Sequence, residues 1–383
     1  MKQHFSRMIA VAAALILGLT VLAGCETAIG NSDQTTAVVL QGKKYSLEEA
    51  KLYVYASQYM IEQQSEFIIS YMYKSYDEFW EYEQNGSTYY EMNFIEGINK
   101  LLQTKRLVMK ANAEGIALTA EELQKVEDAI VKFKEDEARV VAASGCSDEL
   151  LRQYITENAL AVKTYLSMIA DVDTTFDEAT FRRKNVEGIY VTALTEKPAE
   201  TEEAAEGEGE EAEEETEEDA EPYSEEEQTA AREEAVTVIK TRLKAGEEVS
   251  EIVDSFADSE TVKVYSTGSL TLSPDDAAEE GADITTYRQL GWTMATGDVE
   301  TIDITNSSET VTSYILRSVN DDDPDMRASA EKSELTSRKS ALFGERYAAL
   351  IEQYPKYHVY ENVVATIKKV IPMYDSESFA TEE

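Results

Sequence analysis

Few residues in this chain have the chemistry for covalent or metal-based catalysis. The sequence holds two histidines, His4 and His358, and two cysteines, Cys25 and Cys146. Zinc sites and Ser-His-Asp or Cys-His catalysis need these residue types close together, and two cysteines are too few for a disulfide framework. The sequence therefore predicts no metal site and no cofactor, and it assigns no catalytic residue.

The segment Ser144-Gly145-Cys146-Ser147 is a predicted helix start, where a helix favours a thiolate. No second thiol and no base accompany Cys146 in the sequence. We interpret Cys146 as an unreactive free cysteine, and His358, which lies in a terminal segment, as a surface residue.

Cys25 differs from Cys146 because a targeting signal precedes it. Lys2 and Arg7 form a charged end, and Met8 to Leu22 form an apolar run of signal-peptide length. The run ends Leu22-Ala23-Gly24-Cys25, which resembles the lipobox of bacterial lipoproteins, where small residues fit the peptidase and the thiol receives diacylglycerol. The alternative is a membrane anchor, for which the run is short. The resemblance implies a leader over residues 1–24, lipid on Cys25, and a protein held at the extracytoplasmic face of a cell membrane, as on a Gram-positive cell surface.

The charge of the chain excludes one class of partner. The formal net charge is -41, whereas nucleic-acid binding needs clustered Lys and Arg. Between Glu200 and Glu221 there are 14 acidic residues and no basic residue. Such a tract cannot bury enough apolar surface to fold, so a disordered acidic insertion is predicted over 197–223. A weak cation-binding or basic-client-binding tail is the alternative, but the ligand spacing of a calcium loop is absent.

The first half of the mature chain is predicted to be helical. Ser46-x-x-Glu49 has the form of a capping box that starts a helix running to about Tyr73. This helix carries a stripe of Tyr, Met and Phe that is wider than one helix face needs, so part of the stripe is expected to be exposed. Further helices are expected over 92–113, from Thr119 onward, and from Ser147 to about Ala170.

The stretch from Ala230 to Ser259 predicts a second kind of structure. Apolar residues recur three or four positions apart from Ala231 to Leu243, Gly246 ends this helix, and a shorter apolar stripe follows. Strand-like runs lie on both sides, at 187–194 and at 313–319. The predicted order is strand, helix, glycine, short helix and final strand.

This order resembles a parvulin domain, the small peptidyl-prolyl isomerase module. Gly297-Asp298-Val299 looks like the Gly-Glu-Val element of that family, and 314–317 like its last strand. Parvulins carry one histidine near the start of the first strand and another on the last, and the corresponding positions here are Gly188 and Tyr314. The resemblance implies an apolar substrate groove, for which the candidate lining residues are Tyr190, Trp292, Met294 and Tyr314.

A helical array followed by a parvulin-like module resembles the extracytoplasmic foldases of the PrsA and SurA type, in which a C-terminal helix returns to complete the chaperone domain. Residues 335–353 supply such a helix, 356–360 a final strand and 363–371 a last helical turn or two. The resemblance implies an α+β fold in which the parvulin-like domain is inserted into a mainly helical chaperone domain. The expected divisions are leader 1–24, tether 25–36, helical domain 37–175, parvulin-like domain 176–325, C-terminal helix and strand 326–371, and tail 372–383.

Several functions remain open from the sequence. The resemblance implies a lipid-anchored foldase or chaperone that binds unfolded exported polypeptides through Tyr- and Met-rich surface. In that case the parvulin-like module is either a binding or spacing domain or an isomerase with an unusual pocket. A solute-binding lipoprotein of a transporter is the alternative, although such proteins alternate strands and helices throughout. A purely structural envelope role and homodimerisation are also left open.

Overall fold

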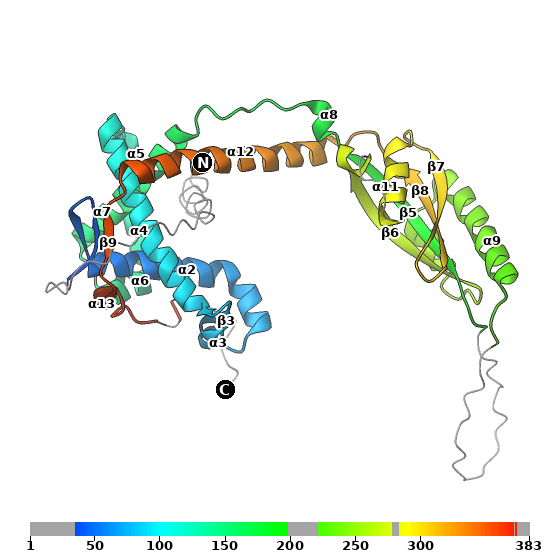
Figure 1. The fold of residues 1–383 in the computed structure, drawn as a ribbon, viewed down its shortest axis with the longest axis horizontal. Helices are drawn as coiled ribbons and strands as arrows, with labels where there is room; N and C mark the ends of the chain where they lie inside the picture. The colour runs from blue at the N-terminus through cyan, green and yellow to red at the C-terminus, as the bar shows by residue number, and fades with distance from the viewer. Residues whose placement is uncertain (1–34, 198–220, 278–282, 371, 374–383) are drawn as a thin grey trace, which may run out of the picture. The chain divides into compact units, whose positions relative to one another are not determined.

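The computed structural model describes residues 35–197, 221–277, 283–370 and 372–373 (Figure 1). The predicted leader, Cys25 and most of the acidic insertion lie outside these residues. The chain divides into two compact units, one formed by Met1–Val172 with Ser337–Glu383 and the other by Asp173–Thr336. None of the described helices is long and apolar enough to cross a membrane.

Unit 1 is mainly helical and contains two small antiparallel sheets, with strand orders β2-β1-β9 and β3-β4. Its elements are β1 (Thr36–Leu40), β2 (Lys43–Ser46), α2 (Leu47–Met72), α3 (Tyr76–Glu81), β3 (Glu83–Gln84), β4 (Ser87–Thr88), α4 (Tyr89–Glu114), α5 (Ala120–Asp136), α6 (Ala138–Ser144), α7 (Asp148–Met168), β9 (Tyr357–Val359) and α13 (Glu361–Val364). The later part of α12 (Pro324–Gln353) also belongs to this unit.

Side-chain caps explain where the helices of unit 1 begin. The Ser46 hydroxyl accepts a hydrogen bond from the Glu49 backbone N–H at 3.2 Å, which starts α2 at the predicted position. Thr119 and Glu122 form a reciprocal capping box at the start of α5. The predicted helix at 92–113 is α4, which begins three residues earlier because Thr88 caps it.

The core of unit 1 forms where the first half of α2 crosses α4. The two helices approach so closely that a β-carbon on Gly97 would lie 2.7 Å from Val54 Cα. Beside this contact lies a buried ionic cluster in which Lys105 of α4 pairs with Glu49 of α2 and Glu157 of α7. Burial raises the pKa of the Glu49 carboxyl, and the Lys105 ammonium opposes that rise. The cluster therefore ties three helices together.

The C-terminal part of the chain returns to unit 1 in two places. In α12, Phe343, Tyr347 and Leu350 pack in one apolar cluster with Tyr165 of α7. Beyond α13, the backbone at Lys368, Val370 and Met373 is hydrogen-bonded to side chains of α2. The Glu62 carboxylate of α2 is fully buried and accepts hydrogen bonds from the Trp80 indole at 2.8 Å and from the Met373 backbone N–H at 2.6 Å. A buried carboxylate is stable only with such donors.

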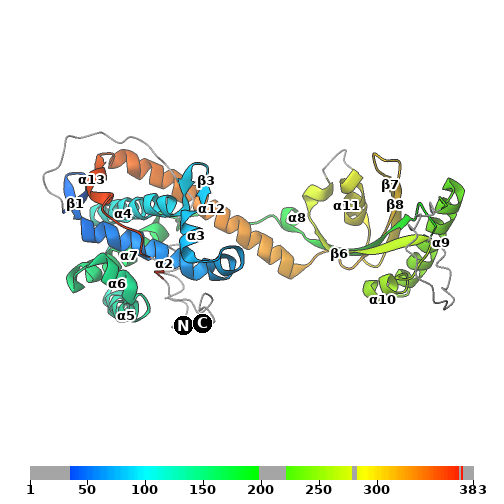
Figure 2. The ribbon, with the colours of Figure 1, turned by 90° about the horizontal axis from the view of Figure 1, so that it is seen from below.

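Unit 2 is one four-stranded antiparallel sheet with helices on both faces (Figure 2). Its strand order is β6-β5-β8-β7. The elements are α8 (Glu178–Phe181), β5 (Lys184–Ala193), α9 (Glu225–Lys244), α10 (Val249–Asp254), β6 (Val262–Leu272), a 3₁₀ turn (Pro274–Ala277), α11 (Asp283–Thr293), β7 (Val299–Thr305) and β8 (Val311–Ser318).

The predicted α+β class is confirmed, and three details of the sequence prediction are corrected. The helix expected over 335–353 is α12, which begins at Pro324, because proline fits the first helical turn. The last helical segment, expected over 363–371, is the single turn of α13, Glu361–Val364. The helix α11, which covers part of the unit 2 sheet, was not predicted.

Candidate functional site

The two faces of the unit 2 sheet are covered to different extents. On one face, α9 and α10 pack over Ile189, Val191 and Ile315, all fully buried. Arg317 of β8 contacts the end of α9. It pairs with Glu187 and donates hydrogen bonds to the carbonyl oxygens of Leu243, in the last turn of α9, and of Glu247, just after it, at 3.2 and 3.1 Å. On the opposite face, the single helix α11 packs on Val186, Leu272, Met294 and Leu316.

Beside α11, a row of tyrosines crosses this second face. Tyr190 of β5 pairs in register with Tyr265 of β6 and with Tyr314 of β8. The ring centroid of Tyr190 lies 5.2 Å from that of Tyr265 and 5.8 Å from that of Tyr314. Tyr287 of α11 stacks on Tyr314 at 4.7 Å with an interplanar angle of 1°. The structure thus brings together two predicted site residues, Tyr190 and Tyr314, within a larger aromatic group.

Sequence reasoning missed Tyr265 and Tyr287. Tyr265 had a readable signal, because Val262 and Val264 alternate with Lys263 and Tyr265 as they do in a strand with one buried face. Tyr287 had none, since only the packing of α11 against the sheet places its ring beside Tyr314.

Gly188 is required by the close approach of β5 to β8. A β-carbon at this position would lie 2.6 Å from the Ile315 carbonyl oxygen and 2.7 Å from Leu316 Cδ2. Leu316 is fully buried, and the Ile315 carbonyl oxygen belongs to the backbone of β8. A side chain at position 188, which the sequence analysis matches to the first parvulin histidine, would therefore clash with β8.

The other two predicted site residues, Trp292 and Met294, lie at the end of α11. Met294 is buried in the apolar cluster under that helix, and the half-buried Trp292 ring lies 5.3 Å from the Arg182 guanidinium. The fully buried Lys184 ammonium donates hydrogen bonds to the carbonyl oxygens of both residues and lies 3.6 Å from Asp321. Burial lowers the pKa of Lys184, and Asp321 opposes that shift. These contacts give Trp292 and Met294 a packing role at the end of α11.

The tyrosine row offers aromatic contact and hydroxyl groups rather than acid–base catalysis. Partial burial, with Tyr287 and Tyr190 close by, raises the pKa of the Tyr314 hydroxyl above its ordinary value near 10. The Tyr314 hydroxyl is therefore protonated at neutral pH and is available as a hydrogen-bond donor. Among the described residues no group of histidine, cysteine, aspartate and glutamate is arranged to hold a metal ion.

A second candidate site lies at the C-terminal end of α2 in unit 1. The aromatic stripe predicted for this helix divides along its length: Tyr53, Tyr55 and Tyr59 are buried. The last two turns present four large apolar side chains to solvent, with exposed fractions of 80% for Phe67, 55% for Ile68, 83% for Tyr71 and 66% for Met72. The Phe67 and Tyr71 rings stack at 6.3 Å. We call these four residues the apolar end of α2.

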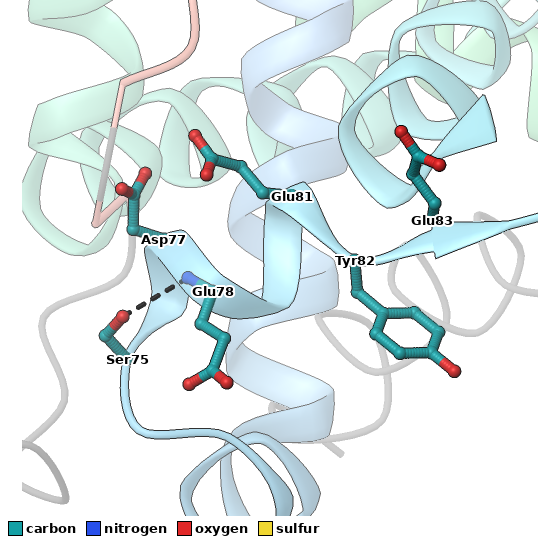
Figure 3. A pocket seen from close by; sticks show the side chains of 6 residues that line it. All are labelled: Ser75, Asp77, Glu78, Glu81, Tyr82 and Glu83. Carbon is teal, nitrogen blue, oxygen red and sulfur yellow. Dashed lines mark hydrogen bonds between the residues drawn. The ribbon is translucent and has the colours of Figure 1, made fainter.

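An acidic hollow of about 540 Å³ adjoins α3, the helix that follows (Figure 3). It is lined by Ser75, Asp77, Glu78, Glu81, Tyr82 and Glu83. The carboxyl groups of Asp77, Glu81 and Glu83 stand out to the same side in Figure 3. The Lys369 ammonium lies 2.8 Å from both Asp77 and Glu81, so two of the lining carboxylates already pair with a cation of the chain itself.

Comparison with known proteins adds two distant structural neighbours. The foldase protein PrsA from Lactococcus lactis is 12% identical, with a TM-score of 0.27, and the match covers 87% of this chain and 97% of that one. The foldase protein PrsA from Streptococcus pneumoniae str. Canada MDR_19A is 12% identical, with a TM-score of 0.21 and coverage of 78% and 96%. No protein-family model and no curated protein sequence matches the chain. Whole-chain similarity this low does not establish a common fold, so we transfer no residue role from either structure.

Proposed function

We propose that this protein is a membrane-tethered, extracytoplasmic folding factor that binds unfolded exported polypeptides. The observation that carries the proposal is the apolar end of α2. Large apolar side chains grouped on a surface cost free energy in water and mark sites where another chain binds. Tyr71 and Met72 suit contact with many sequences, because aromatic rings supply area and methionine adapts its shape.

Unit 2 is then a parvulin-like module that serves as a binding or spacing domain. Two observations support this assignment. Gly188 leaves no space for a histidine, and the Tyr314 hydroxyl, whose pKa is raised by partial burial, stays protonated at neutral pH. Lowering the barrier to proline isomerisation requires an apolar pocket with polar groups around the twisted amide. The tyrosine row supplies aromatic contact for a client chain.

The alternative, a solute-binding lipoprotein, is less well supported. Such proteins are built from α/β lobes whose strands and helices alternate. Every described strand pair here is antiparallel, and the secondary-structure elements from α2 to α7 are all helices apart from one two-stranded hairpin.

The double variant Phe67→Ser/Tyr71→Ser is expected to weaken client binding. In an assay of the light scattered by an aggregating unfolded protein, we expect the variant to need at least about tenfold more chain than the wild type for the same suppression, because two exposed aromatic anchors are lost. The matched control is Val131→Ser on α5, which removes another exposed apolar side chain of unit 1. Equal activity of the wild type and the double variant would show that the apolar end of α2 does not bind clients.

A further inference from the structure

The end of unit 1 that carries the exposed apolar side chains also carries a local excess of negative charge. From Phe67 to Glu91 the chain has five acidic residues and one basic residue, Lys74. Four of the five carboxylates line the acidic hollow at α3. Glu91 is the fifth, and it is engaged in the cap of α4.

Two tyrosines connect the apolar and acidic parts of this surface. Tyr73 follows Met72 directly at the end of α2, and its ring centroid lies 5.9 Å from that of Tyr82. Tyr82 is half exposed and lines the acidic hollow. Contacting aromatic rings therefore connect the end of α2 to the acidic hollow, so that an extended chain bound at the one can continue to the other.

Two carboxylates that line the hollow already pair with a positively charged side chain. The Lys369 ammonium pairs with Asp77 and Glu81, whose side chains remain 62% and 67% exposed. Glu78 is bound on one side by the backbone N–H of Lys74 at 2.8 Å. Exposed carboxylates next to an apolar surface favour a partner with positive charge, because opposite potentials attract and like charges repel during encounter.

From this juxtaposition we infer that the end of unit 1 formed by Phe67, Ile68, Tyr71 and Met72 together with the acidic hollow selects polypeptide segments in which basic residues flank apolar ones. The inference rests on the proposed function and specifies its clients. An acidic client of equal apolarity is held less tightly.

The test uses two unfolded peptides with the same apolar core of leucine and phenylalanine, one flanked by lysines and the other by glutamates. Their binding to the full chain is measured by fluorescence anisotropy at low salt, about 0.02 M, and again at about 0.5 M. We expect the lysine-flanked peptide to bind about tenfold more tightly at low salt, and the difference to shrink to about twofold at high salt.

Because the whole chain is strongly acidic, a pair of charge variants locates the effect. Glu78→Lys/Glu83→Lys changes the hollow, and Glu248→Lys/Glu251→Lys makes the same change in net charge at two exposed positions at the start of α10 in unit 2. Only the first is expected to remove the preference for the lysine-flanked peptide. Should Glu78→Lys/Glu83→Lys lose the native fluorescence of Trp80, Glu78→Gln/Glu83→Gln replaces it, with about half the effect expected.

Three outcomes would overturn the inference. Equal binding of the two peptides, with Phe67→Ser/Tyr71→Ser weakening both, would leave the proposed function standing without charge selection. Equal loss in both charge variants would assign the preference to the overall charge of the chain. Binding of neither peptide, with self-association that Phe67→Ser/Tyr71→Ser abolishes, would assign the surface to a second copy of the chain and would remove the proposed function as well.

Discussion

Replacing Gly188 with alanine is expected to destabilise unit 2 by about 3 kcal/mol, at the upper end of the cost of overpacking a core. The new methyl group would lie 2.6 Å from the Ile315 carbonyl oxygen and 2.7 Å from Leu316 Cδ2, well inside normal contact distance. The backbone on one side and a fully buried leucine on the other leave no easy relaxation. Gly188→His, which adds a much larger side chain at the same place, is expected to prevent unit 2 from folding.

The chain offers a convenient probe for this measurement. It has two tryptophans, Trp80 in unit 1 and Trp292 in unit 2. In a Trp80→Phe background, urea unfolding followed by tryptophan fluorescence reports on Trp292 of unit 2. Because this change also removes a hydrogen-bond donor to the buried Glu62, each variant is compared with the Trp80→Phe chain itself. The control is Ser269→Val, which adds a larger side chain at an exposed position on the neighbouring strand and is expected to change stability by less than about 0.5 kcal/mol. An unchanged midpoint for Gly188→Ala would show that the two strands separate without cost.

Replacing Lys105 with methionine is expected to cost about 3–5 kcal/mol in the stability of unit 1. Lys105 is 1% exposed and neutralises Glu49 and Glu157, whose side chains are 6% and 13% exposed. Without the ammonium, two buried carboxylates would face each other with no cation between them, and the three helices α2, α4 and α7 would lose their common contact.

This prediction is checked by urea unfolding of a Trp292→Phe chain, in which Trp80 reports on unit 1. Lys110→Met is the matched control, because Lys110 lies on the same helix and pairs with the half-exposed Glu114; its loss is expected to cost less than about 0.5 kcal/mol. Adding Glu49→Gln and Glu157→Gln to Lys105→Met is expected to recover much of the lost stability. If Lys105→Met lowers the free energy of unfolding of unit 1 no more than Lys110→Met does, the buried ionic cluster does not stabilise the unit.

The elements that local chemistry specifies were predictable from the sequence. The hydroxyls of Ser46, Thr119 and Ser147 cap α2, α5 and α7 at the predicted helix starts, because a cap needs only residues three positions apart. The strand-like runs at 187–194 and 313–319 likewise indicated β5 and β8, which pair with each other in the sheet.

Features that depend on contacts between distant segments were not predictable. Gly188 reads as an ordinary strand glycine until β8 is placed against it. The aromatic stripe on α2 is a second example. Its width indicated that part of it is exposed, but the sequence did not indicate that the exposed residues lie at the C-terminal end of the helix. The reason is tertiary, since α4 and α6 pack on the first half of α2, whereas α3 covers only the Ile69 side of its end.

We propose that unfolded polypeptides bind at the apolar end of α2, and photo-crosslinking tests this binding most directly. A photoreactive phenylalanine analogue is placed at Tyr71, and in a second chain at Val131 on α5, both exposed positions of unit 1. We expect an unfolded client to crosslink from position 71 and not from position 131, with the crosslink lost when excess unlabelled client is added. Equal crosslinking from the two positions, or none from position 71 while aggregation is still suppressed, would contradict the claim.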